Sequence, residues 1–356
     1  MPDVVDLTQD LIRFKSMHSR PDEIQKCMAF MESYLARHGV GYRRFEQNGV
    51  PTLLVLRPDG YAPVLLMAHI DVVDAPDEMF EPRVENGRLF GRGSIDDKYA
   101  AALSLVLAVE LLHKLNARGK TQADLPCGIL ISGDEEIGGH NGAQAALRQV
   151  RSDFAIALDG GHLRKVVVKE KGILRLKLIG RGKAAHGARP WLGENAIENL
   201  IGDYFKIKRH FDLTAADHWH RTLNFSRFQA GKAANQVPDY AEALFDIRYT
   251  ENDDMEAVVA AIRREIKGEV EVTEREPLFQ GGRTPYLDRL LAVAGNQEIG
   301  SEHGASDARF LSGFGIPGIV WGPDGDNSAH AVDEHVNIDS LLALHRILDE
   351  FLTGLL

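Results

Sequence analysis

The sequence is poor in cysteine, with only Cys27 and Cys127 among its 356 residues. The two lie far apart and in no metal-binding or redox spacing. The sequence therefore predicts no disulfide framework and no thiolate metal site, and we interpret both cysteines as core residues. Long apolar runs are also scarce. The longest, AAALSLVLAVELL at 100–112, is shorter than the ~20 residues that cross a bilayer, so we expect no membrane segment.

Positive charge is in the minority, with 41 Lys and Arg against 52 Asp and Glu and a formal net charge of −11. No basic run occurs, which argues against a nucleic-acid partner. The chain also lacks internal repeats and low-complexity tracts. Its first residues, MPDVVDLTQDLIRF, carry acids early and follow a helical apolar pattern, unlike a secretory signal. We therefore expect a cytoplasmic protein of ordinary globular composition, with a length that suggests two domains.

The first half of the chain alternates helices with short apolar strands. A helix is predicted over 21–38, because Pro21 suits a first turn and Gly39 a stop. Residues 99–115 are apolar nearly all round and predict a buried helix. Three further runs are continuously apolar, which is typical of strands covered by helices on both faces: 62–69, 127–133 and 154–159. This pattern predicts an α/β fold with a mostly parallel mixed sheet sandwiched by helices.

The pattern changes near residue 173, where ILRLKLI alternates apolar and basic residues. The order that follows is β-α-β-β-α-β, which is typical of a ferredoxin-like α+β domain with one polar sheet face. Asp253 and Glu256 suggest a capping box for its second helix, over 254–267. The predicted strands lie at 173–179, 221–230, 241–249 and 269–275, and the first helix at 194–209. We therefore expect an inserted domain at 173–282 within a larger domain formed by 1–172 and 283–356.

Polar residues follow each apolar strand of the larger domain. Open α/β sheets bind ligands beyond the carboxyl ends of their strands, so we expect these side chains to meet at one edge. A single strand-end acid is usually a cap or turn residue, and the joint pattern carries the prediction. The residues concerned are His69, Asp71, Asp96, the triplet Asp134-Glu135-Glu136, Asp159 and His330.

Histidine and carboxylate ligands without cysteine suit Zn²⁺, Co²⁺ or Mn²⁺. With Asp96 as a bridge, His69 and Asp159 complete one metal site, and Glu136 and His330 complete a second. Two divalent ions then balance three carboxylates and one hydroxide. Paired metals of this kind lower the pKa of a shared water and polarise a carbonyl.

The remaining acids receive other roles. Glu135 adjoins a ligand without being one, so it is a candidate general base. Asp71 points to the same side of the chain as His69 and is expected to accept the second imidazole N–H, which fixes the tautomer. Asp134 is interpreted as a turn or hydrogen-bonding residue.

These residues lie in motifs that resemble the co-catalytic metallopeptidases, a family that includes glutamate carboxypeptidase, aminoacylase, acetylornithine deacetylase, succinyl-diaminopimelate desuccinylase and cytosolic dipeptidases. The resemblance covers essentially the whole chain. It implies a zinc-peptidase-like catalytic domain with an inserted lid and dimerisation domain, two metal ions, most often zinc, and the ligands and base named above. The motifs are MAHIDVV, NGRLFGRGSIDDK, DEE, AHGARPWLGENAI, GKAANQVPDYAEALFDIR, GASDARF and AHAVDEHV.

The resemblance adds three residues. It implies that His186 stabilises the oxyanion of the tetrahedral intermediate, from the partner subunit of a homodimer formed through the inserted domain. Asn235 is expected to contact substrate. Arg309 is expected to bind a substrate carboxylate through its planar fork, with a structural salt bridge as an equal alternative. Lid closure over the substrate is a further expectation.

Two departures leave the substrate open. The family motif has glycine where this chain has Tyr99, and Asp159 replaces the glutamate of the desuccinylase branch, whereas SDARF resembles that branch. An aminopeptidase, dipeptidase or carboxypeptidase acting on a small peptide is the favoured interpretation. An N-acyl-amino-acid deacylase or desuccinylase is the alternative, and a non-catalytic metal-binding protein is the reading from a different class. The other histidines, including His140, His162, His303 and His335, are interpreted as surface or supporting residues.

Overall fold

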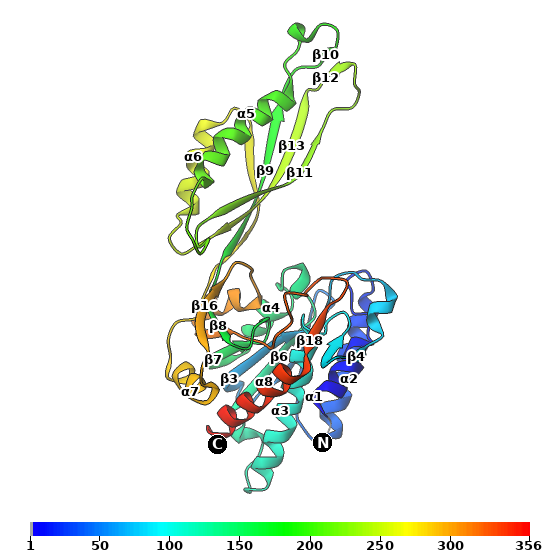
Figure 1. Cartoon of the computed structure of the whole chain (residues 1–356), viewed down its shortest axis with the longest axis vertical. Helices are drawn as coiled ribbons and strands as arrows, with labels where there is room; N and C mark the ends of the chain where they lie inside the picture. Colours follow the sequence, from blue (N-terminus) through cyan, green and yellow to red (C-terminus); the bar gives the residue numbers. More distant parts are fainter. Residues whose placement is uncertain (1–2) are drawn as a thin grey trace. The chain divides into compact units, whose positions relative to one another are not determined.

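The computed structural model describes residues 3–356, which form two compact units (Figure 1). The larger unit contains the chain up to Lys169 together with Phe279–Ser301 and Ser306–Leu356. The second unit, called the inserted unit below, contains Glu170–Leu278 and the short piece Glu302–Ala305. Most of the inserted unit is thus one continuous excursion of the chain between two parts of the larger unit.

The larger unit is built on a mixed sheet in the order β1-β2-β6-β3-β7-β17-β8-β15, with β16 also paired to β8. The central strands β6, β3, β7 and β17 are parallel to one another. Antiparallel pairing joins β1 to β2, β2 to β6, and β17 to β8. The strands are β1 (Arg43–Gln47), β2 (Val50–Val55), β3 (Tyr61–His69), β6 (Cys127–Ser132), β7 (Arg151–Ala157), β8 (Lys165–Glu170), β15 (Phe279–Gln280), β16 (Glu298–Glu302) and β17 (Gly318–Val320). The predicted mixed α/β sheet is confirmed, and its parallel part is the centre.

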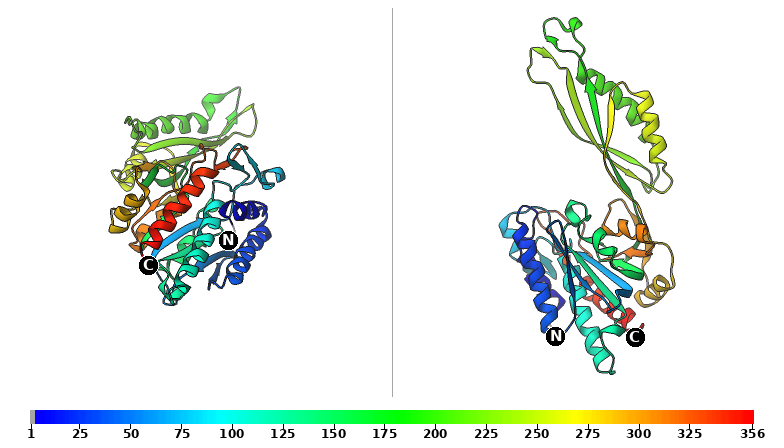
Figure 2. Two further views of the ribbon diagram at one scale, coloured as in Figure 1. Left: turned by 60° about the horizontal axis from the view of Figure 1, so that its bottom comes forward. Right: turned by 180° about the vertical axis from the view of Figure 1, so that it is seen from behind.

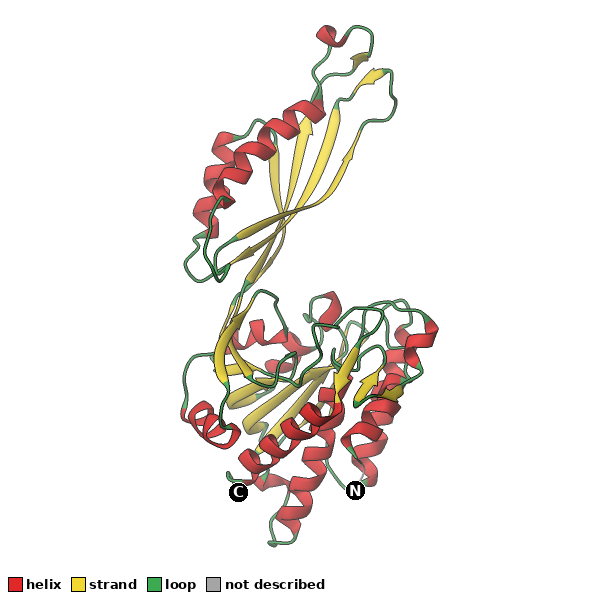
Figure 3. Ribbon diagram, in the orientation of Figure 1, coloured by secondary structure: helices red, strands yellow, loops and turns green. Residues whose placement is uncertain are grey.

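Helices cover both faces of this sheet (Figure 3). Successive strand residues enter different cores: Leu66 joins a cluster with the α2, α3 and α8 side chains, and Leu65 joins a cluster with those of α4. This two-sided burial explains why the strands are continuously apolar. The helices are α1 (Val4–Ile12), α2 (Pro21–Arg37), α3 (Lys98–Asn116), α4 (Ala143–Leu147), α7 (Pro285–Ala294) and α8 (Ile338–Thr353). The predicted first helix begins at Val4, and Met1 and Pro2 lie outside the described residues.

The helix α3 corrects one prediction from the sequence. The apolar run was expected to be too short for a bilayer, yet α3 has 19 residues and is long and apolar enough to cross one by length and composition. Of its most apolar window, 78% is buried inside the protein. The helix lies between the sheet and α1, α2 and α8, so its apolar character is that of a core helix.

The inserted unit contains a four-stranded antiparallel sheet in the order β11-β13-β9-β14. Both of its helices pack on one face, where Leu174, Leu176 and Leu178 are buried (Figure 3). This order confirms the predicted ferredoxin-like arrangement. The elements are β9 (Gly172–Arg181), β10 (Ala185–His186), α5 (Ala196–Lys208), β11 (Thr222–Ala230), β12 (Gln236–Val237), β13 (Tyr240–Tyr249), α6 (Met255–Glu265) and β14 (Glu269–Glu276).

The predicted cap of α6 was wrong by one residue. Asp254, not Asp253, is the N-cap, and its side chain accepts the N–H of Ala257. Asp253 instead accepts the N–H and hydroxyl of Thr250 and pairs with Arg221. Either aspartate is a residue type that caps helices. In the structure the contact with Arg221 engages Asp253, and Asp254 caps the helix.

A small three-stranded sheet, in the order β18-β5-β4, also belongs to the larger unit (Figure 1). Figure 2 shows the chain from two further sides. Its strands are β4 (Arg83–Glu85), β5 (Arg88–Phe90) and β18 (His335–Asn337). It pairs the segment that precedes α3 with the segment that precedes α8. Residues 91–97 and 328–334 are thereby held near each other, although they are distant in the sequence.

Candidate metal centre

The candidate centre is built at the carboxyl ends of the parallel strands of the larger unit. His69 is the last residue of β3, Asp159 follows β7 by two residues, and Glu136 follows β6 after a short turn. Asp96 comes from the segment before α3, and His330 from the segment between β17 and β18. Parallel strands end at the same edge of a sheet, which explains why His69, Glu136 and Asp159 meet. The pairing of β5 with β18 holds the segments of Asp96 and His330 near each other.

The structure brings the five residues together as two groups that share one aspartate. His69, Asp96 and Asp159 offer ligand atoms within 4.8 Å of one another, and so do Asp96, Glu136 and His330. The two oxygens of Asp96 face different histidines: Oδ1 lies 3.0 Å from His69 Nε2, and Oδ2 lies 3.0 Å from His330 Nε2. This is the geometry that a carboxylate needs to bridge two ions.

The donor atoms fit metal ions. His69 Nε2 is buried and, although it lies 3.0 Å from Asp96 Oδ1, makes no hydrogen bond of good geometry within residues 3–356. Its Nδ1 lies 3.0 Å from the backbone carbonyl of Asp71, which accepts only a protonated nitrogen. In the neutral imidazole the lone pair therefore lies on Nε2, the atom that faces Asp96, where a metal ion would bind.

The charges of the centre also favour cations. Burial raises the pKa of Asp159 well above its usual range, and the charges of Asp96 and Asp97 add to this effect. Burial raises the pKa of Glu135 to about 8. Burial also opposes the ionisation of Asp96, but its contacts with His330 and His69 lower its pKa. Divalent cations at these two groups would compensate the buried carboxylates.

Asp71 supports the centre in a way that differs from the expectation. Its backbone carbonyl, rather than its carboxylate, lies nearest to His69 Nδ1, and Oδ1 is 3.4 Å from that nitrogen. The carboxylate instead accepts the N–H of Glu135 at 3.1 Å and of Glu136 at 2.9 Å. His18 Nε2 lies 2.9 Å from Oδ2. Asp71 therefore fixes the backbone of two candidate functional glutamates.

Glu135 lies beside the two groups but belongs to neither. Its Oε1 is 3.3 Å from Arg309 Nη1. Arg309 is buried, lies 3.7 Å from Asp307 Oδ1, and stacks on the ring of Phe310. Its guanidinium is thus engaged by carboxylates of its own chain, as in the salt-bridge alternative.

Asp134 has the structural role expected from the sequence. Its carboxylate accepts the N–H groups of Asn141 and Gly142, each at 2.9 Å. Tyr99, the departure from the family motif, is fully buried, and its hydroxyl donates to the carbonyl of Leu158. Because Leu158 precedes Asp159, the tyrosine packs behind a candidate ligand.

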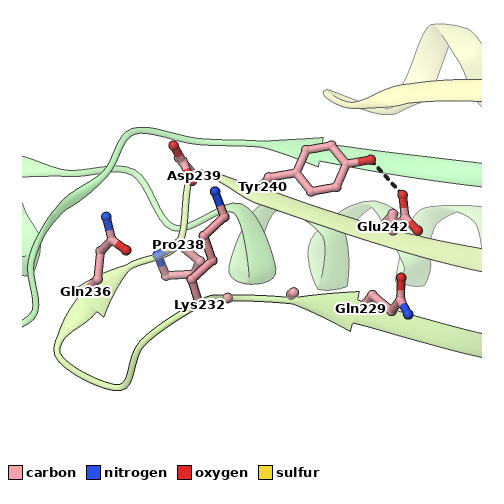
Figure 4. Close-up of a pocket in the computed structure, with 9 residues that line it drawn as sticks. Gln229, Lys232, Gln236, Pro238, Asp239, Tyr240 and Glu242 are labelled. Carbon is pink, nitrogen blue, oxygen red and sulfur yellow. Dashed lines mark hydrogen bonds between the residues drawn. The ribbon is translucent and has the colours of Figure 1, made fainter.

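His186 and Asn235 belong to the inserted unit, where the structure brings them together. His186 in β10 pairs with Gln236 in β12, and the N–H of Gly187 donates to the Asn235 carbonyl at 2.7 Å. A hollow of about 250 Å³ lies beside β12 (Figure 4). Its lining includes Lys232 and Gln236, and the Tyr240 hydroxyl there donates to Glu242 at 2.6 Å.

Sequence reasoning did not single out three residues that support the centre: His18, Arg92 and Glu334. Arg92 and Glu334 form a buried ion pair beside the segments of Asp96 and His330. Arg92 lies inside the motif NGRLFGRGSIDDK, and Glu334 lies inside AHAVDEHV. Their position as charged residues without an assigned role inside these motifs was the signal in the sequence that could have pointed to them.

The fold and the two ligand groups are those expected of a metal-dependent hydrolase, and comparison with known proteins identifies the family. Residues 65–354 match the peptidase family M20/M25/M40, and the chain belongs to this family. Its members are hydrolases that act on amide bonds and depend on metal ions.

Several relatives extend over most of the chain. It is 27% identical to a succinyl-diaminopimelate desuccinylase from Corynebacterium glutamicum, over 99% of this chain and 96% of that protein. It is 30% identical to a probable carboxypeptidase from Aspergillus terreus, over 78% and 67%. A metallo-carboxypeptidase from Sulfolobus solfataricus shares the fold, with a TM-score of 0.77, 17% identity, and 100% and 99% of the two chains covered.

Proposed function

We propose that the chain is a two-zinc hydrolase that cleaves a small peptide bearing a free carboxylate. The observation that carries this proposal is the division of the Asp96 carboxylate between two histidines, with Glu135 beside both groups and outside them. His69, Asp96 and Asp159 would hold one ion, and Asp96, Glu136 and His330 the other. When bound, such ions polarise the scissile carbonyl and lower the pKa of a water.

The residues of the chain perform the proton transfers. Glu135 takes a proton from the attacking water and gives it to the leaving amine. Arg309 contacts one carboxylate oxygen of Glu135 and so orients the other toward the reacting atoms. His186 donates to the oxyanion and Asn235 contacts the substrate, both from the inserted domain at 173–282, which acts as lid and dimer interface.

Glu135→Gln tests the base. We expect this variant to bind metal as the native protein does and to lose 10²–10⁴-fold in kcat, the typical contribution of a general base. Glu350→Gln, which alters an exposed glutamate of α8, is the matched control. An unchanged kcat in Glu135→Gln contradicts the assignment. Binding of a single zinc ion per chain at saturation contradicts the two-metal scheme.

A substrate panel separates the alternatives. Dipeptides and tripeptides should be cleaved faster than N-acetyl or N-succinyl amino acids. Faster cleavage of the N-acyl amino acids would support the deacylase or desuccinylase alternative. The similarity to the bacterial desuccinylase and the SDARF motif favour that alternative. Two bound ions without hydrolysis of any of these compounds support a metal-binding protein that is not an enzyme.

The proposed homodimer predicts complementation between subunits. A mixture of Glu135→Gln and His186→Ala chains, dissociated and reassociated, should recover activity, because one site of the mixed dimer has both groups if His186 acts from the partner. No recovery contradicts action in trans, and a monomeric mass in sedimentation contradicts the dimer. We place this enzyme in the cytoplasm, which fractionation of the native host tests.

A further inference from the structure

A buried ion pair joins the two segments that carry Asp96 and His330. Arg92 is 3% exposed and Glu334 is 1% exposed. Nη1 of Arg92 donates to Oε2 of Glu334. Neither residue belongs to a candidate ligand group. A buried pair of this kind costs desolvation energy and is weak evidence for stability alone, so its other contacts are informative.

Glu334 holds the backbone of the segment that leads to Asp96. Its second oxygen, Oε1, accepts the N–H of Gly93 at 2.8 Å and those of Ile95 and Asp96 at 3.3 Å each. Its own carbonyl accepts the N–H of Gly91. One carboxylate thus organises a segment that contains the shared aspartate.

Arg92 holds the backbone at His330. Its Nη2 donates to the carbonyl of His330 at 3.1 Å and to that of Ala331 at 3.5 Å. His330 has a positive φ of 65°, which is uncommon for a residue other than glycine. Because such a conformation persists only when its surroundings fix it, the contact to its carbonyl helps to set the direction of the imidazole.

We propose that Arg92 and Glu334 are positioning residues that set the separation of Asp96 and His330. They thereby raise the affinity for the ion held by Asp96, Glu136 and His330. The first group depends less on the pair, because His69 and Asp159 are fixed by the ends of β3 and β7. This inference rests on the two-metal site of the proposed function.

Arg92→Met tests the pair by Zn²⁺ titration of the metal-stripped protein, measured by calorimetry. The native chain should bind two ions. The variant should bind one ion about 10–100-fold more weakly, as expected when a residue that orients ligands is lost. It should lose less affinity for the other ion, whose site shares only Asp96 with the first. If the native chain binds only one ion, the proposed function fails. If it binds two and the variant binds both with native affinity, this inference fails.

Arg221→Met is the matched control. Arg221 also combines a carboxylate and a backbone carbonyl: Nη1 lies 2.7 Å from Asp253, and Nε donates to His210 at 2.8 Å. It lies in the inserted unit, so both zinc affinities should stay native. Equal weakening of both ions in Arg92→Met would indicate general destabilisation and would overturn the inference.

Two conservative variants keep the inference testable if Arg92→Met does not fold. Glu334→Gln retains an acceptor for the three backbone N–H groups but presents an amide to Arg92. Arg92→Lys retains the charge without the planar fork that reaches both partners. Each should weaken the same ion more than the other, and Arg92→Lys should do so less than Arg92→Met. Native affinities for both ions in both conservative variants would refute the positioning role.

Discussion

Lys98, the first residue of α3, carries a buried positive charge. Its side chain is fully buried, Nζ donates to the carbonyl of Phe14 at 2.6 Å, and the ring centre of Phe80 is 5.5 Å away. Burial lowers the pKa of Lys98 to about 8. An unfolded lysine titrates near 10.4, so folding disfavours the charged form.

The size and sign of this effect follow from the difference in pKa. At pH 7, charging Lys98 in the folded state costs about 3 kcal/mol relative to the unfolded chain. Between the two pKa values the unfolded state binds more protons, so stability rises with pH. By pH 9.5 the cost falls to about 1 kcal/mol, a gain of about 2 kcal/mol.

Lys98→Met removes the charge and keeps most of the apolar stem. The change leaves the Phe14 carbonyl without its donor, which costs about 1–3 kcal/mol at any pH. The difference between native protein and variant should therefore shift by about 2 kcal/mol toward the native protein from pH 7 to pH 9.5.

Urea denaturation at the two pH values, with EDTA present so that metal release does not contribute, measures this shift. Lys114→Met, which removes a partly exposed lysine of the same helix, controls for the loss of one lysine from α3. A difference between native protein and Lys98→Met that stays the same at both pH values would refute the reasoning.

Three further predictions concern the residues behind the ligands. Tyr99→Phe leaves the Leu158 carbonyl unpaired and should lower the free energy of unfolding by about 1–3 kcal/mol; an unchanged urea midpoint contradicts it. Asp71→Asn leaves one backbone N–H of the two glutamates without an acceptor and should weaken zinc binding about 10–100-fold by calorimetry; native affinity counts against this role. The hydrogen bond to Asp71 raises the pKa of His18, so the stability that protonated His18 contributes is complete below about pH 6.5 and is lost as pH rises through the raised value. His18→Gln should remove that part of the pH dependence of unfolding, and an NMR titration of the His18 ring that midpoints at or below 6.5 would oppose this.

Much of the fold could be predicted because burial leaves a direct trace in the sequence. The strands β3 and β6 are apolar at nearly every position since both faces are covered, and β9 alternates because one face is exposed. The proximity of His69, Glu136 and Asp159 could be anticipated for a related reason. Segments that follow parallel strands converge, and mutually repelling carboxylates there imply a cation.

The supporting contacts could not be predicted in this way. Whether His69 faces the carbonyl or the carboxylate of Asp71 depends on side-chain rotamers, which leave no periodic pattern. Arg92 and Glu334 meet because β5 pairs with β18, a pairing of two three-residue strands with little signal of their own. Arg309 shows the same limit, because both a substrate and an internal carboxylate suit its fork.

The place of the insertion constrains the order in which the chain can assemble. The strand β17, which joins β7 to β8 in the sheet of the larger unit, is synthesised only after Glu170–Leu278. The two ends of that excursion are neighbours, since Ile173 in β9 pairs with Glu276 in β14. Once Glu170–Leu278 has folded, its two ends are held close together, so it no longer counts as a long loop between β8 and β17. This lowers the entropic cost of closing that loop by on the order of 3 kcal/mol. Early folding of the inserted unit during translation would thus prepare the sheet for its last strand.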